Sequence, residues 1–175
     1  TSSEIQDHYE KYKLYYQPSF KFDGVNDYIN ITNSTSIKSL NKSGSFESWI
    51  YLNSQPASLT TIFDYAGTSG LILLYNDCGT NKLSVQVSNG SASYSACDTN
   101  ALSTNQWYHV VGTWDYGNGI KLYVNGQNKG SKGANFAFDP YSTANVLLGS
   151  NNGNSRFWNG SMDNVRIYNR SLSAN

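Results

Sequence analysis

The stretch that decides the fold is QWYHVVGTWDYGNGIKLYVNGQ, which spans Gln106–Gln127. Within it, Trp107–Asp115 and Ile120–Val124 each alternate between two sets of side chains, and residues two apart share one face of a strand. A turn containing two glycines joins these runs. Asn125-Gly126 follows the second run and accommodates the positive φ that a type I′ hairpin requires at both central positions. The stretch predicts a three-stranded antiparallel meander of Trp107–Asp115, Ile120–Val124 and Gln127–Ser131.

Other short strand-like runs alternate with turns along the rest of the chain. Nine of them are predicted as strands: Ser19–Asp23, Tyr28–Thr32, Ser45–Leu52, Thr60–Tyr65, Leu71–Asn76, Lys82–Ser88, Ser91–Ala96, Asn145–Gly149 and Ser161–Asn169. Many short strands at this spacing, with almost no helix, indicate an all-β sandwich or barrel. We expect the tryptophans to lie in the core or between the sheets: Trp49, Trp107, Trp114 and Trp158.

The first 17 residues differ from everything that follows. Ile5, Tyr9, Tyr12 and Tyr16 fall at helical spacing, which predicts a short amphipathic helix or a linker to an upstream element. We expect the tyrosine stripe to pack on the sandwich, with partner binding as the alternative. The predicted division is therefore residues 1–17 as helix or linker and residues 18–175 as one domain.

Composition narrows the function classes. The chain has 12 basic residues (Lys and Arg) and 12 acidic residues (Asp and Glu), so its formal net charge is zero. It therefore has no excess of positive charge that would attract nucleic acid or an anionic membrane surface. The longest apolar run, Leu71–Leu74, is too short for direct membrane insertion. Abundant Tyr, Gly, Asn and Ser with few charges are typical of an all-β extracellular or cell-surface protein.

The two cysteines are predicted to form a disulfide. The Asn89-Gly90 turn folds Lys82–Ser88 back onto Ser91–Ala96, which brings Cys97 near Lys82, and Cys78 lies just beyond. The two residues are therefore within plausible reach of each other. A disulfide implies an oxidising compartment, whereas the alternative is two unpaired buried thiols.

Six asparagines begin the Asn-x-Ser/Thr pattern of N-glycosylation. Because Asn, Ser and Thr are abundant, about this number of such patterns is expected by chance. N-glycosylation is therefore possible, but the number of patterns does not itself indicate it. The six are Asn30, Asn33, Asn41, Asn89, Asn159 and Asn169.

Three segments carry a family resemblance. QWYHVVGTWDYGNGIKLYVNG resembles the signature hairpin of laminin G-like domains in the concanavalin A-like lectin/glucanase superfamily. FKFDGVNDYI at 20–29 is similar to the opening strand pair of that family, and NGSMDNVRIYN at 159–169 is similar to its closing strand. The likeness covers Pro18 to Ser173 and implies an antiparallel jelly-roll β-sandwich. It says less about function, because one fold hosts many activities.

Catalysis finds little support in the residues. The histidines are His8 and His109, and a histidine in an apolar strand is usually a hydrogen-bonded core residue; the resemblance makes His109 part of the fold signature. Glycoside hydrolysis needs two carboxylates about 5–10 Å apart. The glutamates are Glu4, Glu10 and Glu47, and Glu47 has no acidic residue two or four positions away. We therefore expect no enzyme activity.

Calcium suits the acidic residues better. A hard cation takes six to eight oxygen ligands, and Asp23, Asn26 and Asp27 offer such oxygens on one tight turn. The resemblance implies a structural calcium that joins the first strands to the last, which adds Asp163 as a ligand. Alternatively, Asp23 stabilises its turn through Asx hydrogen bonds and Asp163 pairs with Arg166.

A polar loop is the candidate carbohydrate site. Aromatic faces suit the C–H surfaces of sugars, and amides and guanidinium groups suit the hydroxyls. The alternative is that the loop is only a soluble connection. The predicted residues are Asn151, Asn152, Asn154, Arg156 and Phe157, joined by Tyr116 and Tyr141.

The sequence therefore predicts a non-catalytic extracellular recognition or adhesion module, with glycans or a cell-surface protein as partner and with neither nucleic acid nor membrane insertion. The first alternative is a structural or protein–protein assembly module of a surface filament or coat, in which Ile5–Tyr16 mediates assembly. A polysaccharide-active enzyme domain is the second.

Overall fold

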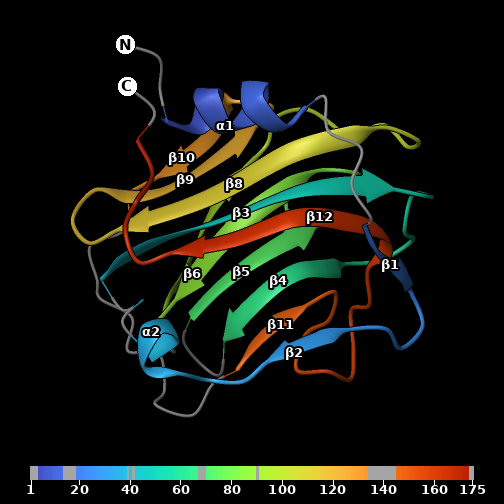
Figure 1. Ribbon diagram of the computed structural model, residues 1–175, viewed down its shortest axis with the longest axis horizontal. Coiled ribbons are helices and arrows are strands. Elements are labelled where there is room, and N and C mark those ends of the chain that lie inside the picture. Colours follow the sequence, from blue (N-terminus) through green and yellow to red (C-terminus); the bar gives the residue numbers. More distant parts are fainter. Residues whose placement is uncertain are drawn as a thin grey trace.

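The computed structural model describes residues 4–13, 19–38, 40, 42–66, 70–89, 91–133 and 145–173. Two six-stranded antiparallel sheets pack face to face, and a helix lies on the outer face of one of them (Figure 1). In spatial order, the first sheet consists of β1 (Phe20–Asp23), β12 (Asn159–Tyr168), β3 (Ser43–Leu52), β8 (Trp107–Asp115), β9 (Gly119–Val124) and β10 (Gln127–Lys132). The second consists of β2 (Ile29–Ile31), β11 (Val146–Leu148), β4 (Thr60–Ala66), β5 (Gly70–Tyr75), β6 (Leu83–Ser88) and β7 (Ser93–Cys97).

The predicted β-sandwich is confirmed, and each predicted strand is present with ends shifted by no more than two residues. The helices are α1 (Glu4–Tyr12) and the four-residue α2 (Thr35–Lys38), of which the sequence predicted only the first. The β8–β9–β10 meander forms as expected. Asn125 and Gly126, between β9 and β10, have φ of 50° and 76°, so both turn positions are left-handed as a type I′ hairpin requires.

The main core lies between the sheets. Phe46 of β3 and Phe63 of β4 face each other with ring centroids 4.3 Å apart, and Trp158 meets Tyr75 edge to face at 6.0 Å. Trp114 is also buried in this core, as expected.

Two tryptophans depart from the expectation because they lie on the outer face of the first sheet. Trp107 is 36% exposed and contacts Tyr51. Trp49 is half-buried and stacks on Tyr9 of α1, at 5.8 Å between ring centroids. Both belong to the alternating set that points away from the second sheet.

Helix α1 covers that outer face. Ile5 is fully buried in a second apolar cluster with Val111, Tyr123 and Leu172. The backbone N–H of Ile5 donates to the carbonyl of Ser173 at 3.3 Å, so segments from the two ends of the chain meet there. The predicted amphipathic helix therefore packs on its own sandwich. Tyr16 and the predicted boundary at 17/18 lie outside the described residues, and that boundary stays a prediction.

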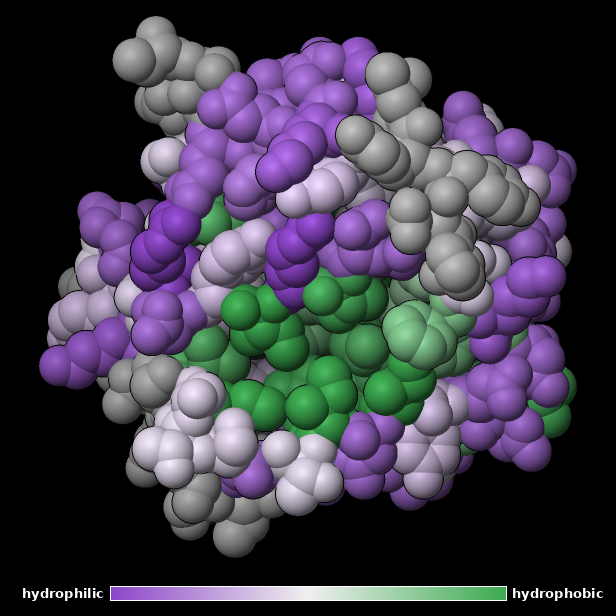
Figure 2. Space-filling view, in the orientation of Figure 1, coloured by the Kyte–Doolittle hydropathy of each residue, from purple (hydrophilic) through white to green (hydrophobic). Residues whose placement is uncertain are grey.

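Apolar side chains also reach the surface on one side of the sandwich. Figure 2 shows them over β4 and β11, in the gap between β12 and β2, surrounded by hydrophilic residues. Half-buried side chains that pack against the core include Ile29 and Ile31 of β2 and Val165 and Ile167 of β12. None of the described helices is long and apolar enough to cross a membrane.

Cys78 and Cys97 form a disulfide, so the predicted pairing is confirmed. Their Cα atoms lie 5.9 Å apart, and Cys97 pairs in register with Ser84 at the start of the β6–β7 hairpin. The bridge joins that hairpin to the loop that follows β5.

Replacing both cysteines with serine should lower the free energy of unfolding by about 3 kcal/mol, because the disulfide restricts the unfolded chain. Urea denaturation followed by tryptophan fluorescence measures this loss. The denatured, unreduced protein should show no reactive thiol. Two reactive thiols, together with an unchanged urea midpoint in the variant, would contradict the bridge.

Candidate functional site

Several polar segments meet at one end of the sandwich, and we call this surface the rim. It consists of the turn at 24–28, the loop at 151–157 and the side chains of Asn53, Ser54 and Asn159. Asn159 pairs in register with Asp23, accepts a hydrogen bond from Asn53 Nδ2 at 3.3 Å, and donates to Ser54 Oγ at 3.2 Å. Residues distant in the sequence are thereby fixed in one place.

The loop at 151–157 is held from below by a buried carboxylate. Asp64 of β4 is 1% exposed, and its Oδ2 accepts hydrogen bonds from Asn151 Nδ2 and from the backbone N–H of Asn152, both at 3.1 Å. Asn152, Gly153 and Arg156 have positive φ, which gives the loop its tight shape. The structure therefore turns the amide of Asn151 inward, while the side chains of Asn152, Asn154 and Arg156 are exposed and Phe157 is half-buried.

Tyr28 joins this loop and was missed by the sequence analysis. Its side chain is 45% exposed, and its ring edge rests against Gly153: a Cβ built on Gly153 would lie 3.3 Å from Tyr28 Cζ. The sequence shows that a tyrosine lies beside a turn. It does not show that this tyrosine contacts a residue 125 positions later, because that contact depends on the tertiary structure.

The other two predicted aromatic residues are not brought to the loop. Ser43, the first residue of β3, pairs with Asp115 beside Tyr116, whereas Leu52, the last residue of β3, pairs with Gly160 beside the rim. At about 3.3 Å per residue, the length of β3 separates Tyr116 from the rim by roughly 30 Å. Tyr141 lies outside the described residues.

The predicted calcium ligands are also divided. Asp23 Oδ1 accepts the backbone N–H groups of Val25 at 2.8 Å and Asn26 at 3.4 Å, which is the Asx turn of the alternative interpretation. Asp27 Oδ2 accepts the N–H of Asp23 at 3.0 Å. Asp163 lies four residues along β12 from Asn159, the partner of Asp23, which corresponds to about 13 Å.

Asp163 makes local contacts instead. Its carboxylate accepts the backbone N–H of Asn164 at 2.6 Å and the side-chain amide of Asn164 at 3.1 Å, and Arg166 donates to Asn164 rather than to Asp163. Among the described residues, no cluster of three or more His, Cys, Asp or Glu side chains could hold a metal. The oxygens of Asp23, Asn26 and Asp27 remain the donor set with the chemistry that calcium prefers.

The sequons lie in varied surroundings. Asn30, Asn89 and Asn169 are exposed, whereas Asn33 and Asn159 are half-buried. The side-chain amide of Asn159 is already hydrogen-bonded within the rim. Asn41 lies outside the described residues.

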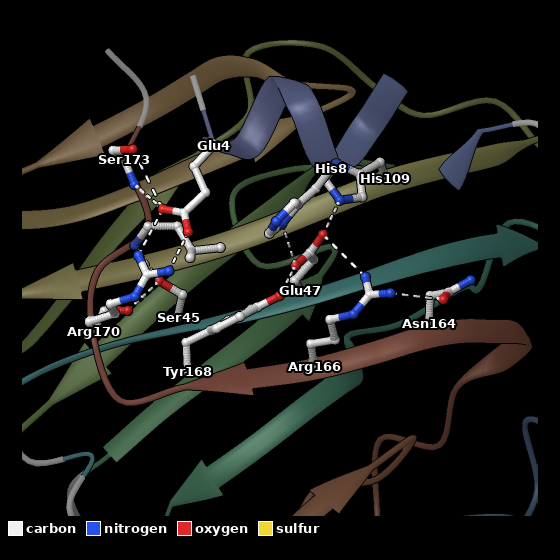
Figure 3. Close-up of polar contacts among 11 residues, drawn as sticks. Glu4, His8, Ser45, Glu47, His109, Asn164, Arg166, Tyr168, Arg170 and Ser173 are labelled. Atoms are coloured by element: carbon white, nitrogen blue, oxygen red, sulfur yellow. Dashed lines mark hydrogen bonds and ion pairs between the residues drawn. The ribbon is translucent and has the colours of Figure 1, made fainter. Parts of the chain in front are cut away.

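A cluster of charged and polar side chains lies beneath α1, on the outer face of the first sheet (Figure 3). Glu47 of β3 is 1% exposed; His109 Nε2 lies 2.8 Å from its Oε1, and His8 Nδ1 lies 3.1 Å from its Oε2. Tyr168 donates its hydroxyl to Oε2 at 2.8 Å, and Arg166 approaches Oε1 at 3.6 Å. An ionised carboxylate only accepts hydrogen bonds, so each facing imidazole nitrogen carries a hydrogen.

The electrostatics of this cluster favour an ionised Glu47. Burial alone raises the pKa of Glu47, but hydrogen bonds from His109 and Tyr168 outweigh it, so its pKa lies below the usual range. The described contacts of Glu47 are with two imidazoles, a phenol and a guanidinium rather than a second carboxylate. The cluster therefore resembles a buried structural ion pair more than the acid pair of a glycosidase.

The chain is thus an antiparallel β-sandwich of two six-stranded sheets, with a polar rim at one end. The chain matches the laminin G-like family model described as the concanavalin A-like lectin/glucanases superfamily over residues 23–175, and it belongs to this family. The resemblance noted in the sequence is thus confirmed. No curated protein sequence gives a significant match.

Solved structures show the same fold. A candidate carbohydrate-binding protein from Bacteroides ovatus is 24% identical with a TM-score of 0.69, over 89% of this chain and 44% of that one. Domain 4 of an extracellular arabinanase from Geobacillus stearothermophilus, solved with arabinotriose, is 20% identical with a TM-score of 0.66, over 89% of this chain and 72% of that one. The receptor-binding domain of a botulinum neurotoxin C/D mosaic is 18% identical with a TM-score of 0.71, over 92% of this chain and 41% of that one. The chain thus spans less than half of the first and third proteins, and the TM-scores show a common fold.

Replacing Glu47 with alanine should lower the free energy of unfolding by roughly 3–5 kcal/mol, since it leaves buried polar partners without their acceptor. Chemical denaturation measures the change. Glu10→Ala, on the exposed side of α1, is the control and should change stability by about 0.5 kcal/mol or less. Equal effects of the two substitutions would show that the Glu47 cluster does not hold α1 to the sheet.

The carboxyl group of Asp64 should titrate near pH 6, because burial raises its pKa to about 6 against hydrogen bonds from Asn152 and Asn151 that lower it. A carboxyl whose pKa is raised by folding binds protons more tightly in the folded state, so its contribution to stability falls as pH rises from about 4 to 6. Relative to Asp64→Asn, the wild-type protein should lose up to about 3 kcal/mol over this range. Parallel stability curves for the two proteins would contradict this pKa.

Proposed function

We propose that this chain is a non-catalytic carbohydrate-binding module of an extracellular or cell-surface protein, and that glycans bind at the rim. The observation that carries the proposal is the exposed ring of Tyr28 packed against Gly153, in a loop that also exposes Asn152, Asn154 and Arg156. This combines an apolar platform with hydrogen-bonding groups that suit a polyhydroxylated ligand.

Each exposed group has a distinct part in binding. The ring of Tyr28 would contact the C–H face of a sugar. The amides of Asn152 and Asn154 would donate to and accept from its hydroxyls, and Arg156 would only donate. Asp64 and the positive φ values hold the loop in one shape before a ligand arrives, which reduces the ordering entropy that binding costs.

The structural relatives support this proposal at the level of fold. One is a candidate carbohydrate-binding protein, and another is a domain solved with a bound arabino-oligosaccharide. The disulfide supports an oxidising, extracellular setting, because such bridges are rare in reducing compartments. An adhesion role, in which the glycan lies on another cell surface, fits the same site.

Calcium has a place in the proposal at the turn beside the rim. Asp23, Asn26 and Asp27 would supply oxygen ligands and waters the remainder, and the charge of the ion would offset the two nearby carboxylates. Asp163 is left out of this set because the register of β1 and β12 keeps it away from the turn.

A protein partner is the second candidate, and one observation favours it. β1 is an edge strand, and its neighbourhood exposes the apolar side chains of Phe20 and Val25, at 58% and 67%. A protein-binding or assembly role would use this edge rather than the helical segment, whose Ile5 is already buried on the sandwich.

Replacing Tyr28 with alanine should weaken binding to the glycan that the wild-type chain recognises by roughly tenfold or more, because it removes the stacking platform. A glycan array probed in millimolar calcium identifies the ligand, and calorimetry with that glycan gives the affinity. Tyr28→Phe, which keeps the ring, should retain most of the binding.

Tyr116→Ala is the matched control. Tyr116 has a similar exposure of 53% but lies at the opposite end of β3, so its loss should leave affinity unchanged. Chelation should lower the melting temperature if calcium occupies the 23–27 turn. Equal affinities of Tyr28→Ala and wild type would place the site elsewhere. A blank array with folded protein would favour the protein partner.

A further inference from the structure

A polar cleft lies between α1 and the end of the first sheet where β9 turns into β10. Its volume is about 530 Å³, within the usual range for small-ligand sites. Its lining comes from α1, the segment after β7, the start of β8 and the β9–β10 turn. We call it the α1 cleft. The α1 wall precedes residue 23, where the family match begins, so it lies outside the part of the chain that the family describes.

A buried carboxylate lines this cleft. Asp98 is 2% exposed, and its Oδ1 accepts the backbone N–H of Asn100 at 2.9 Å. None of the ion pairs among the described residues involves Asp98. A carboxylate can only accept hydrogen bonds, so Asp98 suits donor groups on a ligand, such as hydroxyls.

Three other side chains in the cleft have their acceptor atoms occupied and keep donors available. The Tyr108 hydroxyl accepts N–H groups from Ser103 and Gln106, so its own O–H is left to donate. Asn125 Oδ1 accepts the N–H of His109 at 2.9 Å, and Gln127 Oε1 accepts from Lys129 at 2.9 Å. Because the amide oxygens of Asn125 and Gln127 already accept hydrogen bonds, their amide nitrogens are the atoms that can donate to a ligand.

The remaining lining adds an aromatic ring and balanced charge. Tyr9 of α1 supplies the ring. Glu10 is already bound by Gln6 and Lys13, and Lys129, whose ammonium donates to Gln127, adds a positive charge to the lining. A strongly cationic ligand would meet Lys129, and a strongly anionic one would meet Asp98 and Glu10.

We infer that the α1 cleft is a second saccharide-binding site, which takes a neutral sugar residue whose hydroxyls donate to Asp98 and accept from Tyr108, Asn125 and Gln127. The inference rests on the chemistry of the cleft and not on the rim. The cleft and the rim lie at the same end of the first sheet, because β9 ends, β3 ends and β12 begins there. Between β12 and β9 lie three inter-strand spacings, about 14 Å across the sheet, and Asn159 and Asn125 are also offset by four residues, about 13 Å, along the strands.

The test uses the full chain, labelled with ¹⁵N, and three probes: methyl β-D-glucopyranoside, methyl β-D-galactopyranoside and methyl α-D-mannopyranoside. At least one glycoside should shift the side-chain amide signals of Asn125 and Gln127 in a saturable way. Asp98→Asn should weaken that binding at least tenfold, because it keeps the oxygen that caps Asn100 and removes the charge. Gln127→Ala, at an exposed position, is a second variant that should weaken binding without disturbing the fold.

Asp115→Asn is the matched control, since Asp115 also accepts a hydrogen bond within a turn but lies at the opposite end of β8. It should bind the glycoside as the wild type does. Tyr28→Ala should also leave the cleft titration unchanged, which distinguishes this site from the rim. The inference is overturned if none of the three glycosides shifts the cleft amides, or if Asp98→Asn and Gln127→Ala both bind normally.

Discussion

The burial of both faces of β3 and β8 is the constraint on which the rest of the structure depends. The second sheet covers their inner face with a continuous apolar core, and α1 covers their outer face. The outer covering buries the carboxylate of Glu47, and a buried charge has to be compensated by partners. Those partners come from α1, β8 and β12, so one charged group joins a segment from each end of the chain to the centre of the sheet.

Two other buried carboxylates hold segments at the surface of the sandwich. Asp64 holds the loop at 151–157, and Asp98 caps the segment that forms one wall of the α1 cleft. In each case a carboxylate beneath the surface accepts a backbone N–H of the segment above it. A loop held in this way loses less conformational entropy when a ligand binds to it.

Much of the fold was predictable because local signals agreed with the global structure. Alternation along β8 and β9, the Asn125-Gly126 turn and the helical spacing of Ile5 and Tyr9 each act over a few residues. The candidate site was predicted less well. The loop at 151–157 is visible as a polar run, but its partner Tyr28 and its anchor Asp64 are distant in the sequence, and Tyr116 lies at the wrong end of the molecule. The outward placement of Trp107 was also missed, because alternation defines two faces without stating which one meets the second sheet.

The sequence by itself determined the strands, the hairpin turns, the amphipathic helix and the pairing of Cys78 with Cys97, because each follows from periodicity, turn conformation or the folding of one hairpin. Only the tertiary structure decided which carboxylates are buried, which aromatic rings remain exposed and which loops share an end of the sandwich. These depend on strand order and register, in which β1 pairs with β12 and β3 lies between β12 and β8. These pairings join residues more than fifty positions apart, and more than a hundred where β12 takes part. Their energies arise only when the two sheets and α1 come together.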